Sequence, residues 1–344
     1  MLKGSNEVME QEIKQILEGK AVEPGGTFKA FCIFREVTKR QDKNGKTYYD
    51  AIACDSTGNL DAKIWSDALW LDKSGFAKTE DEHMTEDDIA EIVGKTIGIN
   101  VRVTEYKGAP QYSITKVTLL NQDQYPPSAY VAHSPIPQKI LEARFERLVS
   151  QTDGKINDFL KFVFTDKLKK DFFYWPAATG YHHAYAAGLL EHTVSVTDLA
   201  LNMAKTLEES GYVINKNIVI AGALFHDIGK LRAYRMTSVP EVTVGGVVLD
   251  HIALGYEMIA RLADEFGLEE KTKLHLLHII LSHHGQRDFG SPVVPGTPEA
   301  MVISSSDELD FRMFCCFDAL KTTSTSFPIS AWNNATQRRF WRTE

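Results

Sequence analysis

Residues 218–230 read IVIAGALFHDIGK, and this stretch decides how the second half of the chain folds. Its nearly unbroken run of apolar residues predicts a buried helix that ends at His226 and Asp227. Neighbouring residues on a helix point only about 100° apart, so both side chains can face one metal ion while the carboxylate bridges to a second. The stretch therefore predicts a helical domain with a metal site at a helix end.

The histidines gather in the same half of the chain, since nine of the eleven lie between His182 and His284. His251 opens the predicted helix HIALGYEMIARL, and the pair at 283–284 ends the predicted helix KTKLHLLHIILSHH. His275 and His278 lie earlier on that helix and are left out of the site. Sites rich in imidazole and carboxylate suit Mn, Fe, Co, Ni or Zn. We expect two divalent ions, with Mn or Fe preferred over Co, Ni or Zn, held by His192, His226, Asp227, His251, His283, His284 and Asp307.

The composition is that of an ordinary soluble globular protein, with 43% hydrophobic and 24% charged residues in a chain of 344. A chain of this length can hold two or three domains. It contains no apolar run of the roughly 20 residues that span a bilayer and no leader-like apolar segment near its start, so we expect a cytoplasmic protein without a membrane partner. The net charge of −8 argues against nucleic-acid binding by bulk electrostatics but leaves room for a local basic groove.

Short β-type runs precede the helical half, at residues 27–37, 47–54, 60–65, 96–106 and 111–120. The sequence DKNGK joins the first two runs, and its Asn-Gly pair is the strongest short signal for a hairpin. An acidic segment between the third and fourth runs can hold one helix. Five strands with a helix between the third and the fourth is the order of an OB-fold, which is a small β-barrel.

The OB-like half carries side chains suited to a single nucleic-acid strand. Such folds stack bases on aromatic rings while basic residues follow the backbone. Two or three of the aromatic residues in the predicted strands are expected to face outward, among Phe31, Phe34, Tyr48, Tyr49, Trp65, Tyr106 and Tyr112. The basic cluster around the first hairpin is the stronger evidence, and it predicts nucleic-acid binding by Arg35, Lys39, Arg40, Lys43 and Lys46.

The change of periodicity along the chain predicts four parts. Residues 1–20 are predicted to form an N-terminal helical extension, residues 21–120 an OB-fold domain that binds nucleic acid, and residues 121–137 a proline-rich linker. Residues 138–344 keep helical periodicity and contain every predicted metal ligand. The predicted fold is therefore multidomain, with an N-terminal β-barrel and a C-terminal all-α domain.

The ligand spacing resembles that of a known superfamily. His192, the pair at 226–227 and Asp307 are similar to the H…HD…D signature of HD-domain metal-dependent phosphohydrolases, and the remaining histidines resemble the extra ligands of its two-metal branch. Three segments are similar to those of YhaM-type 3′→5′ exoribonucleases, which also carry an N-terminal OB-fold: PAATGYHHAYAAGLLEHT at 176–193, LFHDIGK at 224–230 and SHHGQRDFGSPVVPGTPEA at 282–300. The resemblance covers residues 24 to 320 and implies an HD domain in residues 138–344.

This chain departs from the family pattern in two places. Residues 187–188 are Ala-Gly where such proteins often have Gly-Gly, and three serines at 304–306 stand where Ala or His is common before the last aspartate. The second departure leaves Asp310, one helical turn after Asp307, as the alternative last ligand. We choose Asp307, because it aligns with the motif D-x-L-D.

The predicted chemistry is hydrolysis of a phosphodiester by a water activated between two metal ions. Asp227 is the expected bridging carboxylate. Lys230 is expected to reach the non-bridging phosphate oxygens, with a solvent-exposed lysine as the alternative. His182 and His183 are expected to orient the phosphate or protonate the leaving oxygen, and either could do so. Arg287 is a further phosphate-binding candidate by charge. Catalytic roles are thus assigned to Asp227, Lys230 and His183.

The leading hypothesis is a hydrolase that removes nucleotides from the 3′ end of single-stranded RNA, with single-stranded DNA as a further substrate. A phosphodiesterase for small or cyclic nucleotides, with the OB-fold as a scaffold, is the second hypothesis. A non-catalytic module that binds single strands is the third. The sequence does not decide the oligomeric state, and assembly into a homo-oligomer is compatible with each hypothesis.

Overall fold

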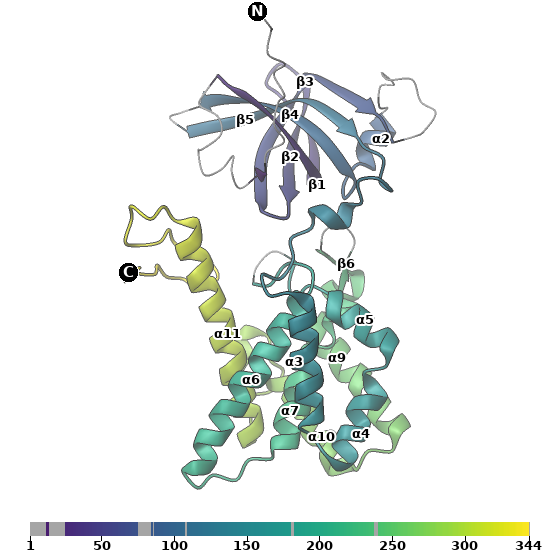
Figure 1. Cartoon of the computed structure of the whole chain (residues 1–344), viewed down its shortest axis with the longest axis vertical. Helices are drawn as coiled ribbons and strands as arrows, with labels where there is room; N and C mark the ends of the chain where they lie inside the picture. Colours follow the sequence, from purple (N-terminus) through teal and green to yellow (C-terminus); the bar gives the residue numbers. More distant parts are fainter. Residues whose placement is uncertain are drawn as a thin grey trace, which may run out of the picture. The chain divides into compact units, whose positions relative to one another are not determined.

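The structure is a computed structural model, and it describes residues 12–13, 25–74, 84, 86–106, 109–179, 182–236 and 240–343. The predicted helical extension at residues 1–20 lies outside the described residues except for Glu12 and Ile13. The chain splits into two compact units, one ending at Ala132 and the other beginning at His133. Each unit is described by itself (Figure 1).

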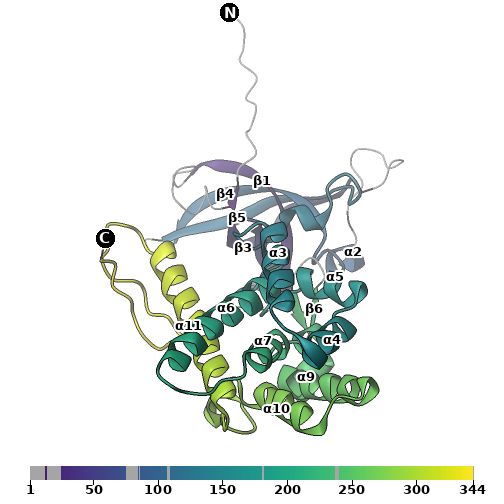
Figure 2. The same ribbon diagram turned by 60° about the horizontal axis from the view of Figure 1, so that its bottom comes forward.

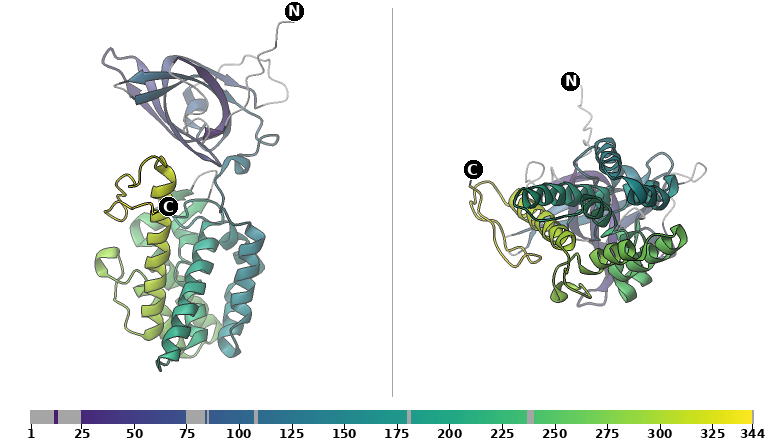
Figure 3. Two further views of the ribbon diagram at one scale, coloured as in Figure 1. Left: turned by 60° about the vertical axis from the view of Figure 1, so that its left-hand side comes forward. Right: turned by 90° about the horizontal axis from the view of Figure 1, so that it is seen from below.

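The first unit is a closed five-stranded barrel, seen end-on in the left view of Figure 3. Its strands are β1 (Thr27–Gln41), β2 (Thr47–Asp55), β3 (Gly58–Asp72), β4 (Thr96–Tyr106) and β5 (Ala109–Leu119). The order around the barrel is β1-β2-β3-β5-β4, and β1 pairs with β4 to close it. The short helix α2 (Glu86–Ala90) lies between β3 and β4 in the chain. This is the topology of an OB-fold, so the predicted fold of the N-terminal half is confirmed.

Side chains at alternate positions along the strands point inward and fill the barrel. Along β1, Phe28, Ala30 and Cys32 are buried, while Lys29 and Phe31 between them are more exposed. The alternation ends at Ile33 and Phe34, which are both fully buried, next to the shift in register with β2 after Phe34. Strand β3 extends to Asp72, seven residues beyond the predicted end at Trp65. Its register with β5 shifts between Ile64 and Leu69, and such an irregularity bends a strand so that it can continue around a barrel. The alternating pattern was too weak in this bent part to reveal the longer strand.

The second unit is a bundle of helices. These are α3 (Gln138–Ser150), α4 (Gly154–Val163), α5 (Asp166–Tyr174), α6 (Gly188–Glu209), α7 (Lys216–Phe225), α8 (Lys230–Ala233), α9 (Val244–Phe266), α10 (Glu270–Ser282) and α11 (Pro298–Thr322). Two 3₁₀ turns, η1 (Pro127–Tyr130) and η2 (Arg287–Phe289), lie outside these helices, η1 in the first unit. The small sheet of β6 (Tyr234–Met236) and β7 (Pro240–Val242) is an addition to the predicted all-α fold. Its three-residue strands are too short to show a period.

Helix α7 is the centre of this bundle, with α4, α6 and α10 around it in Figure 2. Every residue from Ile218 to Phe225 is buried, so the helix has no solvent-facing side. Gly222 permits this packing, because a Cβ there would lie 2.6 Å from the side chain of Ile279 on α10. The predicted buried helix therefore carries His226 and Asp227 into the interior of the domain.

Two observations complete the fold. Helix α9 begins seven residues before His251, but its backbone is non-helical at Asp250 (φ 65°, ψ 158°), so a helical segment does start at His251 as expected. Within the described part of the chain, no helix is long and apolar enough to cross a membrane.

Candidate functional site

One set of ligand atoms, called here group 1, gathers where α7 ends. The Nε2 atom of His192 on α6 lies 3.1 Å from Nε2 of His226 and 3.2 Å from Oδ2 of Asp227. The same Nε2 atom lies 3.1 Å from Oδ1 of Asp307 on α11. Three of the four side chains are almost completely buried, and Asp307 is 14% exposed. Group 1 therefore combines two imidazoles with two carboxylates in a space of metal-site size.

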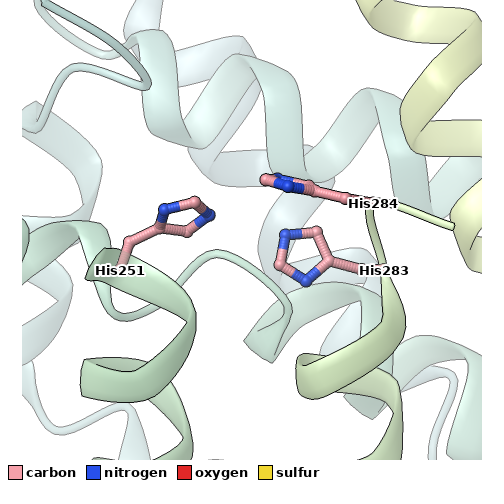
Figure 4. A group of neighbouring side chains, drawn as sticks. All are labelled: His251, His283 and His284. Carbon is pink, nitrogen blue, oxygen red and sulfur yellow. The ribbon is translucent and has the colours of Figure 1, made fainter. Parts of the chain in front are cut away.

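A second set, called group 2, lies on the other side of the same aspartate. The ligand atoms of His251, His283 and His284 lie within 4.8 Å of one another, and Figure 4 shows the three rings turned toward a common space. Oδ1 of Asp227 lies 3.3 Å from Nε2 of His251 and 3.6 Å from Nε2 of His283. The two oxygens of Asp227 thus face different groups, which is the arrangement of a bridging carboxylate.

All five histidines are oriented by their other ring nitrogen. Nδ1 of His226 donates to the backbone carbonyl of Ala223 at 2.6 Å. Nδ1 of His283 donates to the carbonyl of Ile280 and Nδ1 of His284 to that of Phe289, each at 2.8 Å. In His192 and His251 the partner of Nδ1 is a carboxylate, from Asp310 and Asp250 respectively. A carbonyl oxygen only accepts, so three of the rings must carry the proton on Nδ1 and expose the lone pair of Nε2. Ligand histidines in metal sites are oriented in this way.

Unsatisfied atoms mark the place of a cation. Oδ1 of Asp227, Nε2 of His251 and Nε2 of His283 are buried and have no hydrogen-bond partner among the described residues. A buried polar atom without a partner costs free energy, and a divalent ion between these atoms would satisfy all three. The residues present therefore fit a metal centre, and the donor set of imidazoles and carboxylates suits the transition metals named above.

The pKa shifts agree with this interpretation. Burial lowers the pKa of His226 to about 4, and burial together with His283 lowers that of His284 to about 4, so both rings are neutral at pH 7 as metal ligands must be. Burial alone would lower the pKa of His192 also, but hydrogen bonds with Asp227, Asp307 and Asp310 raise it well above its usual value. Three buried carboxylates around one ring create an excess of negative charge that a bound cation would neutralise.

Gly229 in HDIGK sets how closely the helices approach. A Cβ at this position would lie 1.9 Å from the backbone oxygen of His251 and 2.5 Å from the nitrogen of Gly255. Only glycine therefore allows the start of the second segment of α9 to pack against the turn after Asp227. This packing brings His251 within reach of Oδ1 of Asp227.

Lys230 contacts the bridging aspartate directly. Its Nζ atom donates to Oδ2 of Asp227 at 2.5 Å, and the residue is 5% exposed. Burial opposes a charged ammonium, but the nearby Asp227 outweighs it and raises the pKa of Lys230. The alternative of a solvent-exposed lysine is wrong, because the turn after α7 folds into the domain rather than away from it.

The structure gives Asp307 and Asp310 different places. Asp307 contacts Nε2 of His192, the nitrogen that faces His226, whereas Oδ2 of Asp310 accepts from Nδ1 of His192 at 2.8 Å. Asp310 also contacts Nε2 of His183 at 3.1 Å. The sequence left these two aspartates open, because one helical turn of separation puts both on the same face of α11.

His182 and His183 also separate. His182 lines the cavity beside the metal groups, and burial lowers its pKa well below the usual value, so it is a neutral ring. His183 has both ring nitrogens engaged, one with Asp310 and the other with the hydroxyl of Tyr185 at 2.6 Å. It is not one of the residues that line the cavity. The structure therefore places His182 at the cavity and His183 behind His192.

A cavity of about 510 Å³ opens beside the two groups. Asp227, Lys230, His284 and Asp307 form its metal side. The other lining residues are His182, Phe289, Glu308, Phe311, Arg312 and residues 335–338. Arg287 is exposed and does not line this cavity, although the neighbouring Phe289 does.

Several cavity residues escaped the sequence analysis. Phe311 follows Asp307 by four positions and Arg312 follows Glu308 by four, so the helical period could have placed each pair on one face of α11. Residues 335–338 gave no signal, because they lie outside any periodic segment.

The barrel carries a second candidate surface, formed by neighbouring strands β2 and β3. The rings of Tyr48 and Trp65 lie with centroids 5.1 Å apart, and Nζ of Lys63 is 4.8 Å from the centroid of the Tyr48 ring. Trp65 is 38% exposed and Tyr106 is 59% exposed. A shallow cavity of about 450 Å³ between β2, β3 and β5 is lined by Lys63, Tyr106 and Tyr112 among others.

The predicted basic cluster is partly neutralised. Lys39 donates to Glu86 at 3.0 Å, and Arg40 lies 3.5 Å from Asp50. Lys43 and Lys46 are exposed in the hairpin, and Arg35 is half-buried at the bend of β1. Glu86 comes from α2, which the hairpin sequence does not reveal, whereas Asp50 lies on β2, the second strand of the hairpin.

Comparison with known proteins adds the following. A model of the HD domain family matches residues 189–312, which span His192 to Asp310. The chain is 28% identical over 291 residues to the 3′-5′ exoribonuclease YhaM of Oceanobacillus iheyensis, covering 84% of this chain and 85% of that protein. Among solved structures, the second OB-fold domain of replication protein A from Methanococcus maripaludis is 11% identical with a TM-score of 0.20, covering 32% of this chain and 94% of that one. A putative aspartyl-tRNA synthetase from Leishmania major is 9% identical with a TM-score of 0.22, covering 80% of this chain and 56% of that one.

The family match falls on the helices that carry group 1, and the match to the exoribonuclease extends over both units. The HD match agrees with the ligand groups on these helices. Residues 189–312 therefore resemble an HD domain, and the chain is similar over most of its length to a YhaM-type 3′-5′ exoribonuclease.

Proposed function

We propose that this protein is a metal-dependent 3′→5′ exoribonuclease that hydrolyses the phosphodiester bonds of single-stranded RNA. The observation that carries the proposal is Asp227, whose two oxygens face two separate groups of oriented imidazoles. The polarity and the RNA substrate are taken from the relative in Oceanobacillus iheyensis, a 3′-5′ exoribonuclease. Single-stranded DNA and a cytoplasmic location remain predictions.

Two divalent ions would be held by the seven predicted ligands, with Asp227 shared between them. Such ions supply an activated water near neutral pH and neutralise charge on the phosphoryl group. Asp310 positions His192 through Nδ1, and the backbone carbonyls of Ala223 and Ile280 position His226 and His283. These contacts hold the ligands before a substrate arrives.

Residues of the cavity would act on the substrate itself. Lys230 would share its charge between Asp227 and a non-bridging phosphate oxygen. Phe289 and Phe311 line the same cavity and offer faces on which a base can stack. His182, a neutral ring beside them, would donate or accept a hydrogen bond at the phosphate. His183 would act indirectly, by holding Asp310.

The OB-fold would hold the strand upstream of the cut. Tyr48 and Trp65 form a partly exposed aromatic pair, and the ammonium of Lys63 lies beside it while it pairs with Asp50 at 2.6 Å. Stacking with a nearby cation binds single strands with little sequence preference. This suits an enzyme that shortens RNA of any sequence.

The test is a time course with single-stranded RNA labelled at its 5′ end, with Mn²⁺ added to protein freed of metal. Progressive shortening that stops with a chelator and returns with Mn²⁺ supports the proposal. Intact RNA together with turnover of a cyclic dinucleotide would instead support the small-nucleotide hypothesis. Binding of RNA without hydrolysis of either substrate would support the non-catalytic one.

A further inference from the structure

The segment after α11 is a built element rather than a loose tail. Residues 328–342, called here the C-terminal hairpin, fold back on themselves through bridges that pair Ile329 with Trp341 and Asn333 with Arg338. Backbone hydrogen bonds of 2.8 Å join Ser330 to Phe340 and Asn333 to Arg338. Figure 2 shows this segment as a loop beside α11 that ends at the C-terminus.

The hairpin is tied to α11 at its open end and has a fixed turn at its tip. The guanidinium of Arg342 donates to the backbone carbonyls of Leu320 and Thr323, where α11 ends. At the tip, Oδ1 of Asn333 accepts from both the backbone nitrogen and the hydroxyl of Thr336 at 2.8 Å. Gln337 adopts a left-handed backbone (φ 51°), which is unfavourable for a residue other than glycine. Such strain persists only where the surroundings determine the conformation.

The tip reaches the metal centre. Residues 335–338 line the same cavity as Asp227, Lys230 and Asp307, although nothing in their sequence resembles a ligand or a motif. The cavity of about 510 Å³ is in the range of pockets for single small molecules, which is roughly 300–1,000 Å³. A cavity of this size can hold one nucleotide. Aromatic faces from Phe289 and Phe311 line it, and Gln337 and Arg338 add polar groups at the tip.

We propose that the C-terminal hairpin closes this cavity around a single terminal nucleotide and thereby restricts cleavage to a chain end. The inference rests on the proposed function and names the structural cause of its exonucleolytic mode. A strand that continues past the scissile phosphate would have to pass through the space of residues 335–338. A free 3′ end fits, because its last nucleoside needs no exit.

The experiment compares a covalently closed circular single-stranded RNA with the linear RNA of the same sequence, in Mn²⁺. The full chain should shorten the linear RNA and leave the circle intact, whereas a variant that lacks residues 325–344 should cut the circle. Cleavage of the circle by the full chain overturns the inference, and so does a shortened variant that still acts only on ends. A full chain that hydrolyses neither RNA overturns the proposed function instead, so the two failures are distinguishable.

Two further measurements guard against a merely structural effect of the deletion. The shortened variant should keep its bound metal and its hydrolysis of bis(p-nitrophenyl) phosphate, a small diester that needs no nucleotide pocket. Loss of both would show that the hairpin supports the metal centre, which overturns the inference.

A second variant leaves the backbone bridges of the hairpin in place. Gln337→Gly combined with Arg338→Ala removes two polar side chains of the tip, which also donate to the backbone carbonyls of Asn334 and Thr336 within the turn. The loss of these polar groups should raise KM for linear RNA roughly tenfold. An unchanged KM would overturn the assignment of the tip to the terminal nucleotide. The matched control is Arg339→Ala, which removes the neighbouring exposed arginine that is not one of the lining residues and should leave KM as it is.

Discussion

The two units of this chain present their functional groups in opposite ways. In the helical unit, His192, His226 and Asp227 are buried, and each histidine is held by a defined acceptor. On the barrel, Trp65 and Lys63 are partly exposed and belong to a shallow surface. Charges and dipoles act strongly where water is excluded and weakly where it is present. We therefore expect single substitutions at the metal centre to have large effects on activity, whereas many residues should each contribute a small part of the free energy of strand binding.

The largest expected effect is at the shared carboxylate. Asp227→Asn removes the charge that both groups share, so we expect kcat to fall by about a thousandfold, since metal activation of water is worth several kcal/mol. Metal analysis of the purified variant should show fewer ions per chain. Asp318→Ala, an exposed aspartate on α11, is the matched control and should retain full activity. Normal metal content with normal activity in the Asp227 variant would remove the basis of the proposed centre.

A smaller but still large effect is expected at Asp310. It contacts Nδ1 of His192 rather than Nε2, and loss of such a supporting carboxylate typically costs about 10–100-fold in metal affinity or activity. Asp310→Ala should therefore weaken Mn²⁺ binding, measured by titration, and added Mn²⁺ should restore much of the activity. In contrast, Asp307→Ala should not be rescued by Mn²⁺. Identical behaviour of the two variants would mean that their places on α11 have no separate roles.

Acid should destabilise the metal-free helical unit. Burial lowers the pKa of His226 and His284 from 6.5 to about 4, so the unfolded state binds more protons between these values and stability falls as pH decreases. At pH 5 the loss is about 2 kcal/mol for each histidine, because one pKa unit corresponds to about 1.4 kcal/mol. The raised pKa of His192 stabilises the folded state as pH decreases. This stabilisation is already complete below pH 6.5, the usual pKa of histidine.

Thermal melting of the metal-free protein at pH 7 and pH 5 measures this difference. The drop in Tm between the two pH values should be smaller in His284→Phe, which cannot take up a proton. A drop as large as in the original chain would show that His284 is not the titrating group. The barrel offers a contrast, since the indole of Trp65 does not ionise and strand binding should change little.

The aromatic pair on the barrel should contribute about tenfold to strand affinity. Trp65→Ala removes one stacking platform, and base–aromatic stacking is worth roughly 1–3 kcal/mol per base. The Kd for a single-stranded RNA should rise accordingly, while hydrolysis of a small diester stays unchanged. Tyr212→Ala, an aromatic residue 64% exposed on the helical unit, is the control. An equal change in both variants would argue against a specific role of the barrel face.

The smallest effects are expected in the basic hairpin. Lys43→Ala and Lys46→Ala should each weaken RNA binding a few-fold and reduce the slope of log K against log salt by about 0.7, as expected for one lost phosphate contact on a single strand. Lys39→Ala should matter less, because its ammonium already pairs with Glu86. A salt titration of RNA binding separates the three variants. Equal slopes for all of them would show that the ion pair with Glu86 does not reduce the role of Lys39.

The sequence by itself determined the architecture and the list of chemical groups. Alternation in the barrel strands and the apolar run of α7 are local patterns, so they predict the OB-fold and the helical unit without a structure. The pair at 226–227 and the histidines at helix ends are likewise visible because their spacing is local. The sequence shows only that residue 229 of the motif is a glycine. It does not show the close approach that requires this glycine, because the atoms near Gly229 belong to His251 and Gly255 on α9.

Only the tertiary structure decided which groups meet. It separated Asp307 from Asp310, because they contact opposite nitrogens of the His192 ring. It also separated His182, which lines the cavity, from His183, which contacts Asp310. It placed Lys230 on Asp227, paired Lys39 with Glu86 and brought residues 335–338 to the cavity. Contacts between segments far apart in the chain depend on how helices and loops pack as a whole. A sequence pattern shows the periodicity of each helix or strand but not which other segment packs against it.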